Sequence, residues 1–312
     1  MDWNTFLTPL FFVQLLAASV SLATPLVLAA LGEIFAQRSG VLNLGLEGIM
    51  LFSGFIGFSV VFQLNNLWAG MLAAIMIGAL MGLLYAFLAI SLHSNQCVTG
   101  LSLMSLGTGM ALYFYRMQFK ISLEIPRIPT FPKLPIPGLS KIPFIGPVFF
   151  NHSIFTYLMF VLVLIAVLII YRTPFGLRMN AVGESPQTAD TLGVSVSFIR
   201  YLCVVIGGAL AGLAGAYYSL VELGAYSDSM VNGRGFIAAA LVIFGRWDPL
   251  WTLGGGLLFG GIDALQNRLQ VLGSPIPSNF LQMTPYVMTI IVLLVGRLRK
   301  PPTALGNPYI RK

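Results

Sequence analysis

Long apolar segments recur along this chain, and they constrain its fold more than any other feature. Two examples are IFTYLMFVLVLIAVLIIY and YLCVVIGGALAGLAGAYYSL, each long enough to cross a bilayer as a helix. The chain has 312 residues, of which 57% are hydrophobic and 9% are charged, against about 25% charged residues in a soluble domain. Lipid offers the backbone no hydrogen-bond partners, and the runs lack the alternation of a barrel. The sequence therefore predicts an all-α polytopic membrane protein.

The hydrophobic segments form one transmembrane domain that covers residues 1–312. We expect them near Leu10–Leu31, Val41–Phe62, Trp68–Leu92, Cys97–Tyr115, Ser153–Tyr171, Tyr201–Val221, Gly235–Gly245, Trp251–Val271 and Met283–Gly296. The segment Gly235–Gly245 is too short to cross, which predicts a broken or re-entrant helix in a bundle of about nine or ten segments. Glycines four residues apart, such as Gly78 and Gly82, predict close helix packing. The N-terminus is expected to lead into a retained first span.

Basic residues indicate the orientation. Arg297, Arg299 and Lys300 follow the last segment closely, so the positive-inside rule places the C-terminal tail in the cytoplasm. The polar insert 173–200 is then cytoplasmic, and the N-terminus and the loop 116–152 are external. This loop opposes the rule because it carries Arg116, Lys120, Arg127, Lys133 and Lys141. Its many prolines predict an extended, semi-rigid segment. The net charge of +7 is attributed to membrane anchoring, and no nucleic-acid partner is expected.

The insert 173–200 carries the start and stop signals of a short helix. Ser185 can cap free N–H groups, Pro186 suits the first helical position, and Gly193 suits the position just after the helix. These signals predict a helix from Pro186 to Leu192. Because so short a helix is marginal in water by itself, we expect another protein to hold it.

The sequence shows no catalytic constellation. His93 and His152 lie at span ends without metal-ligand spacing, so no metal site is expected. Cys97 and Cys203 both fall in hydrophobic segments and predict no disulfide framework. The glycine-rich stretches lack the GxxxxGK[ST] pattern, and we therefore expect that this chain binds neither ATP nor another cofactor.

A few polar residues fall at membrane depth. Asn43 and Glu47 are four residues apart, as are Asp263 and Asn267, so each pair shares a face if its region is helical. Glycines around the first pair suggest a broken helix that lines a cavity. An ionisable group in a span indicates a functional site, so these four residues are candidates for lining a substrate pathway. Alternatively, Glu47 is structural and bonds to a neighbouring helix end.

Three stretches occur in order: GEIFAQRSGVLNLGLEGIMLFSG, NAVGESPQTADTLGVSVSFIRYLCVVIGGALAGLAGAYYSL and NGRGFIAAALVIFGRWDPLWTLGGGLLFGGIDALQ. Together they resemble the permease subunits of bacterial ABC importers in the branched-chain amino acid, ribose and nucleoside group. The likeness covers nearly the whole chain and is greatest to the shorter permease of nucleoside or simple-sugar systems. It implies a type II importer permease in the bacterial inner membrane. Relatives with an extra N-terminal span differ from this chain.

The resemblance also implies partners and site residues. The partners would be a second homologous permease, ATP-binding subunits that hold ATP and Mg²⁺, and an extracytoplasmic substrate-binding protein. In such permeases the loop that matches residues 180–194 holds the coupling helix that docks on the ATPase. The docking residues would be Glu184, Ser185, Pro186, Gln187, Thr188, Ala189, Asp190 and Leu192. An inverted repeat is expected to relate SGVLNLGLEGIMLFSG to NGRGFIAAALVIFG.

Alternative functions stay open at this point. Within the same family, the substrate could be a branched-chain amino acid in place of a nucleoside or sugar. A stand-alone secondary transporter would need an intramembrane ion or proton site, for which Glu47 and Asp263 are the candidates. A membrane enzyme is disfavoured because the sequence offers no nucleophile–base pair and no metal cluster.

Overall fold

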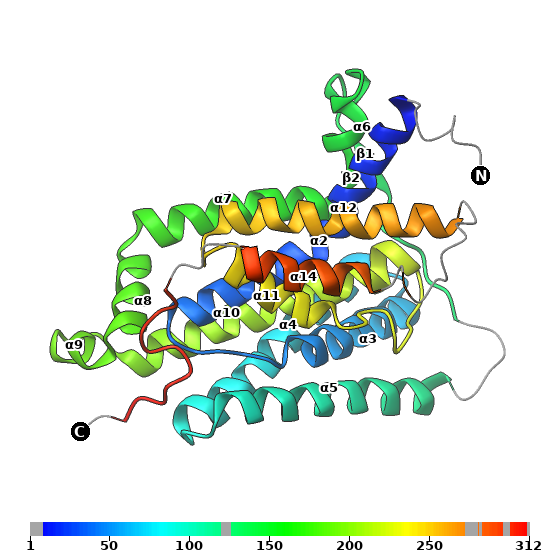
Figure 1. Ribbon diagram of the computed structural model, residues 1–312. Coiled ribbons are helices and arrows are strands. Elements are labelled where there is room, and N and C mark those ends of the chain that lie inside the picture. Colours follow the sequence, from blue (N-terminus) through cyan, green and yellow to red (C-terminus); the bar gives the residue numbers. More distant parts are fainter. Residues whose placement is uncertain (1–8, 120–125, 272–279, 281–282, 296–299, 311–312) are drawn as a thin grey trace.

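The computed structural model describes residues 9–119, 126–271, 280, 283–295 and 300–310 (Figure 1). Among these residues, six helices are long and apolar enough to cross a membrane. They are α2 (Pro9–Arg38), α3 (Leu46–Leu64), α4 (Leu67–Ala86) with its π-helical extension Phe87–Ser91, α5 (Gln96–Phe119), α7 (Ile154–Arg172), and α10 (Val196–Tyr217) with its π-helical extension Tyr218–Leu223.

Three more helices follow in the C-terminal part: α11 (Arg234–Phe244), α12 (Pro249–Val271) and α14 (Thr284–Val295). Short elements complete the described chain: β1 (Lys133–Pro135), a 3₁₀ turn (Leu139–Lys141), α6 (Ile145–Phe149), β2 (Asn151–Ser153), α8 (Pro174–Glu184) and α9 (Pro186–Thr191). Every expected hydrophobic segment thus contains a helix, and the prediction of an all-α membrane protein is confirmed. The 11 residues of α11 confirm the expected short helix.

The first two helices differ from their expected limits. α2 continues to Arg38, well past Leu31, and α3 begins only at Leu46 instead of Val41. Gly40 has a φ of +89°, in the left-handed region that glycine adopts readily, and it turns the chain away from α2. The residues between Gly40 and Leu46 are therefore non-helical, which confirms a break in this region but shifts its position.

The long helices run between two ends of the molecule (Figure 1). One end carries α8, α9 and residues 300–310, and the other carries α6, β1, β2 and the start of α2. The Ala304 N–H donates to the Gly183 carbonyl oxygen at 2.9 Å. The C-terminal tail and the insert 173–200 therefore lie at the same end, as the orientation from the basic residues requires. Of the basic residues used for that orientation, Arg297 and Arg299 lie outside the described residues.

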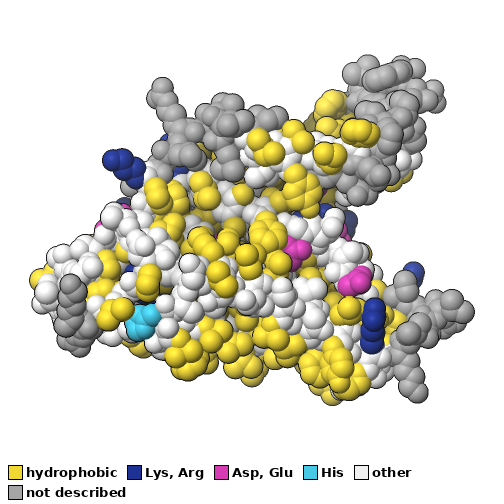
Figure 2. All heavy atoms as spheres, turned by 60° about the horizontal axis from the view of Figure 1, so that its bottom comes forward, with side chains coloured by type: hydrophobic (Ala, Val, Ile, Leu, Met, Phe, Trp, Pro, Cys, Tyr) yellow, Lys and Arg dark blue, Asp and Glu magenta, His cyan; other side chains and the backbone are white. Residues whose placement is uncertain are grey.

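Close contacts between glycines hold the centre of the bundle together. Gly78 and Gly82 on α4 face Gly208 and Gly212 on α10, and a Cβ added at Gly82 would lie 2.9 Å from the Val204 carbonyl oxygen. This confirms the expected role of these glycines in letting two backbones approach. On the outside, hydrophobic side chains spread over the face that Figure 2 presents, with few charged side chains among them. Such a surface suits contact with lipid tails or with another membrane protein.

The proline-rich loop is more folded than expected. β1 and β2 form an antiparallel pair in which Lys133 faces Ser153. The Ile128 N–H donates to the Gly224 carbonyl at 2.9 Å, and the Phe131 N–H donates to the Leu220 carbonyl at 3.0 Å. Proline has no backbone N–H, and the prolines of this stretch fall beside Ile128 and Phe131 and not at them. The N–H groups of Ile128 and Phe131 therefore remain available to bond to the bundle. The loop therefore packs across this end of the bundle, apart from residues 120–125, which lie outside the described residues.

His152 fastens the same loop to α2. Its Nε2–H donates to the Val148 carbonyl at 2.7 Å, so Nδ1 accepts from the Ser21 hydroxyl at 3.1 Å. The ring is buried, and burial lowers the pKa of His152 below its usual value, with nearby Lys133 acting in the same direction. The folded state thus prefers the neutral imidazole.

We expect acid to weaken this fastening. Because the folded-state pKa is lowered, the stability that His152 contributes is fully present above its ordinary pKa of 6.5 and is lost as the pH falls through that value. The melting temperature of the purified protein should therefore fall as the pH is lowered from about 7.5 to about 5. The melting temperature of a His152→Gln variant should fall less over the same range. A His93→Gln variant, at the exposed second histidine, should follow the wild type. Equal pH dependence of all three proteins would contradict this role.

Candidate functional site

Two short helices protrude at one end of the bundle (Figure 1). α8 begins after Thr173, whose hydroxyl accepts from the Gly176 N–H at 3.2 Å, and has Pro174 in its first turn. α9 begins after Ser185, has Pro186 in its first turn, and is followed by Gly193 with a φ of +81°. The predicted helix is confirmed, although it ends at Thr191 rather than Leu192. α8 was not predicted from the sequence, although Thr173–Pro174 is the same kind of start signal as Ser185–Pro186.

The Ser185 hydroxyl does not cap the helix as predicted. It lies 2.8 Å from the Thr188 hydroxyl, and it accepts no backbone N–H of α9. The backbone carbonyl of Ser185 instead accepts from the Ala189 N–H at 3.0 Å. The first turn is therefore closed by the backbone and by a bond between two side chains.

The eight candidate docking residues point in different directions. Pro186 and Ala189 are buried against the bundle, and Ala189 is only 2% exposed. Ser185 and Asp190 are half-buried, while the exposed members are Glu184, Gln187, Thr188 and Leu192. Leu192 is 78% exposed, so it and Ala189 do not share one apolar docking face. The buried pair holds α9 on its own chain, and the exposed set is free to meet a partner.

The chain itself supplies contacts that hold α9 and the end of α8. Residues 300–310 cross this end as an irregular segment with a turn at residues 303–306, called here the C-terminal strap. The Tyr309 hydroxyl donates to Asp190 Oδ2 at 3.1 Å, and the Thr303 hydroxyl donates to Glu184 Oε2 at 2.9 Å. The Arg200 guanidinium, at the start of α10, donates to the Asn307 carbonyl at 3.2 Å. The chain itself thus supplies part of the support for the short helix, and the expectation that another protein holds it stays a prediction.

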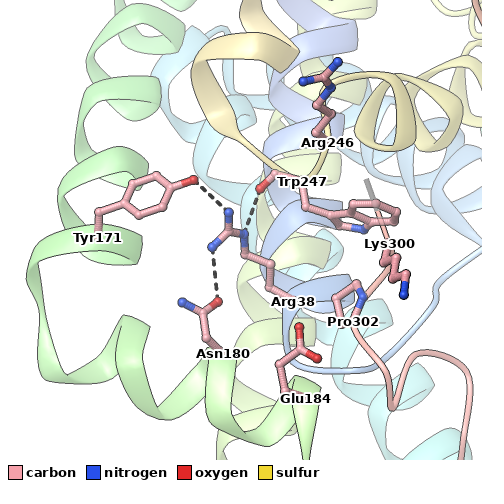
Figure 3. A pocket seen from close by; sticks show the side chains of 8 residues that line it. All are labelled: Arg38, Tyr171, Asn180, Glu184, Arg246, Trp247, Lys300 and Pro302. Carbon is pink, nitrogen blue, oxygen red and sulfur yellow. Dashed lines mark hydrogen bonds between the residues drawn. The ribbon is translucent and has the colours of Figure 1, made fainter. Parts of the chain in front are cut away.

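Arg38 joins the same end to the core of the bundle (Figure 3). Its Nε donates to the Trp247 carbonyl at 2.7 Å, one terminal nitrogen to the Tyr171 hydroxyl at 2.8 Å, and the other to Asn180 Oδ1 at 3.1 Å. These partners belong to the α11–α12 turn, α7 and α8. One buried arginine at the end of α2 thus connects three other parts of the structure.

Two helix N-termini meet inside the bundle. α3 begins at Leu46 and α11 begins at Arg234, and Glu47 Oε1 accepts the Gly233 N–H at 2.7 Å. Glu47 therefore caps the neighbouring helix, as the structural alternative anticipated. Its second oxygen, Oε2, is buried and has no hydrogen-bond partner among the described residues. The inverted repeat expected between these two segments stays a prediction.

The other candidate pathway residues separate into two groups. Asn43 lies before α3 and does not share a helix face with Glu47; its Oδ1 accepts the Gly45 N–H at 2.8 Å. Asp263 on α12 forms an ion pair with Arg234 at 3.4 Å. Arg234 directly follows Gly233, so Asp263 and Glu47 meet at the same helix N-terminus. Asn267 is exposed and takes no part in these contacts.

Sequence reasoning missed Arg234 and the outer face of α5. Arg234 was visible as a charge at the start of an apolar segment, and its guanidinium also lies 5.3 Å from the centroid of the Tyr218 ring. α5 is the least buried of the six long helices and packs mainly on α3. Its exposed face carries Ser102, Ser105 and Tyr113, with Gly109 between them at helical spacing. Three hydroxyls on this face distinguish it from a surface made only for lipid.

Known proteins resemble this chain over almost its full length. The family described as the branched-chain amino acid transport system permease component matches residues 15–295. A guanosine ABC transporter permease from Bacillus subtilis is 39% identical, and the match covers 94% of this chain and 95% of that protein. A nucleoside ABC transporter permease from Lactococcus lactis is 38% identical, with 96% of this chain and 98% of that protein covered.

A solved structure shares the fold. It is described as a metal-chelate type ABC transporter in an inward-facing conformation, with a TM-score of 0.50 and 15% identity. The match covers 90% of this chain and 84% of that chain. With the family match and the two relatives, this establishes the assignment that the resemblance implied. The chain is a multi-pass membrane permease and belongs to the family of branched-chain amino acid transport system permease components.

Proposed function

We propose that this permease is the translocation subunit of an ATP-driven importer for nucleosides in a bacterial inner membrane. The observation that carries the substrate class is its near-full-length similarity to two permeases named for guanosine and nucleosides. Related simple sugars are the second candidate within the same transport mechanism. ATP and Mg²⁺ would be bound by separate ATP-binding subunits, and a second homologous permease and an extracytoplasmic binding protein would complete the transporter.

The exposed side of α8 and α9 would dock on the ATP-binding subunit. It offers Leu192 as an apolar contact, with the polar and exposed Glu184, Gln187 and Thr188 earlier in the same segment. An exposed apolar anchor with polar residues around it is the usual composition of a protein interface. Ala189 and Pro186 support this surface from behind.

Movement of the ATPase would reach the bundle through two connections. The C-terminal strap links α8 and α9 to Arg200 on α10, and Arg38 links α8 to α2, α7 and the α11–α12 turn. Both connections use buried guanidinium groups with several directional hydrogen bonds. The two arrangements of an alternating-access cycle would then differ in how these helices pack.

The exposed face of α5 would form part of the path. A nucleoside is neutral and has hydroxyl groups and a flat base. Ser102 and Ser105 can exchange hydrogen bonds with hydroxyl groups, and Tyr113 can stack on a base. Glu47 would contribute through its unpaired Oε2, whereas the contacts of Asn43 and Asp263 favour a structural role.

The substrate class is tested by uptake in cells that carry the complete transporter. Labelled guanosine should accumulate, and deletion of this chain should abolish the accumulation. Excess unlabelled nucleoside should compete, whereas leucine and glucose should not. Competition by leucine alone would assign a branched-chain amino acid substrate. Uptake by the purified chain alone, driven by a proton or sodium gradient, would instead indicate a secondary transporter.

The docking surface is tested with aspartate substitutions. Leu192→Asp should lower substrate-stimulated ATP hydrolysis by about tenfold or more, since a charge replaces an apolar anchor at the interface. Its melting temperature should stay close to that of the wild type because the side chain is exposed. Ala189→Asp should instead lower the melting temperature, since it buries an unpaired charge.

Leu134→Asp is the matched control, at an exposed leucine on the opposite end of the molecule. It should leave ATP hydrolysis unchanged. Normal substrate-stimulated hydrolysis in the Leu192→Asp variant would exclude this leucine from the coupling surface.

The proposed path is tested at Ser105, whose side chain is exposed on α5. Ser105→Leu removes a hydroxyl and narrows the face, so nucleoside uptake should fall about fivefold or more, as for the loss of one hydrogen bond. Assembly with the partner subunits should be retained. Leu72→Ser, at an exposed leucine on α4, should not change uptake. If the two variants affect uptake equally, α5 has no special part in translocation.

A further inference from the structure

A cavity of about 260 Å³ opens at the α8–α9 end of the bundle (Figure 3). It lies between α7, α8, the α11–α12 turn and the C-terminal strap. Three cationic side chains line it, Arg38, Arg246 and Lys300, against one carboxylate, Glu184. We call it the basic cavity. Its composition suits an anionic ligand.

The cations of the basic cavity have donors to spare. In the described part of the chain, the only ion pair is that between Arg234 and Asp263, so none of the three is paired with a carboxylate. Arg38 uses three of its five N–H groups on Trp247, Tyr171 and Asn180, which leaves two. The arginine is therefore already held in place by the protein and can still donate to a ligand, which lowers the entropic cost of binding.

The rim of the cavity has the features of a membrane interface. Tyr171 lies at the end of α7, and Trp251 at the start of α12 is 64% exposed. The guanidinium of Arg246 lies 5.8 Å from the centroid of the Trp251 ring. Tyrosine and tryptophan at the ends of membrane-crossing helices mark the level of the lipid headgroups. The cavity thus opens at the depth where phosphate groups of lipids lie.

An apolar stripe leads along α7 to the same place. Val161, Leu164, Leu168 and Tyr171 are all exposed and follow one another by three or four residues, so they lie on one face of the helix. This stripe provides a surface for an acyl chain below a headgroup in the cavity. A free cytosolic anion has no acyl chain and would not contact this apolar surface.

We propose that the basic cavity binds the phosphate-bearing headgroup of an anionic phospholipid from the leaflet at the α8–α9 end, with an acyl chain along α7. Arg246 and Lys300 attract the phosphate, and the fixed guanidinium of Arg38 donates hydrogen bonds to it. Basic cavities of this kind between transmembrane helices are typical sites for anionic headgroups. The bound lipid would contact α7, α8 and the strap together, and would thereby stabilise the attachment of the docking helices to the bundle.

The proposal is tested by native mass spectrometry of the assembled transporter, stripped of lipid and then titrated with phosphatidylglycerol or phosphatidylcholine. The wild type should retain phosphatidylglycerol preferentially. The double variant Arg246→Gln/Lys300→Gln should bind it about 25-fold more weakly, at about fivefold for each cation near the membrane surface. Arg178→Gln removes an exposed cation on α8 that does not line the cavity, and it should bind like the wild type.

A variant that binds the lipid more tightly controls for loss of binding through misfolding. Glu184→Gln removes the one carboxylate of the cavity and should strengthen phosphatidylglycerol binding, which a damaged protein would not show. Inorganic phosphate at millimolar concentration distinguishes a free anion from a lipid. If the wild type retains both lipids equally and binds phosphate at the cavity, the ligand is a free anion and not a lipid. Unchanged phosphatidylglycerol binding in the double variant would overturn the proposal.

Discussion

The structure depends on one constraint: inside a membrane, every backbone N–H must find its acceptor within the protein. Helices meet this automatically, but the chain between α2 and α3 is non-helical and packs inside the bundle. There the Leu42 N–H donates to Gln96 Oε1 at 2.8 Å, and the Asn43 N–H donates to Glu33 Oε1 at 3.0 Å. Buried polar side chains on α2 and α5 thus supply the acceptors that a helix would have supplied. Gln96 and Glu33 are thus buried because they bond to the non-helical backbone between α2 and α3, and no substrate is needed to explain their burial.

The same constraint governs the start of α11. Two helix N-termini meet there, and both carry partial positive charge, to which Arg234 adds a full one. Glu47 and Asp263 bring two carboxylates to this point, and Glu222 also acts electrostatically on Arg234, so the positive charges are offset by the protein's own carboxylates. The arginine and the helix ends are thereby held in place without a bound ligand. A neutral solute can pass such a cluster without being held, which agrees with a nucleoside or sugar and disfavours the stand-alone secondary transporter.

The elements that sequence predicted are those governed by local rules. Apolar length located every hydrophobic segment, and Pro186 with Gly193 located α9, because these signals act within one turn of their own residues. What escaped were contacts between distant parts of the chain. Nothing local to Tyr309 indicates that its hydroxyl meets Asp190, and nothing local to Ala189 and Leu192 indicates that one is buried and the other exposed. The helix period alone cannot tell which face of a six-residue helix turns towards its own bundle.

The contacts of α8 explain why the α8–α9 end is joined so firmly to the rest of the bundle. A short helix transmits force only if it moves together with the longer helices, and packing through Ala189 alone would let it pivot. Arg38 and the strap add directional bonds to Asn180 and Glu184, which lie four residues apart on one face of α8, and these bonds oppose its separation from the bundle. Both also border the basic cavity, where Arg38 and Lys300 lie near Glu184. An anion in that cavity would sit between the strap and α7, so its presence bears directly on how rigidly α8 and α9 follow the membrane-crossing bundle.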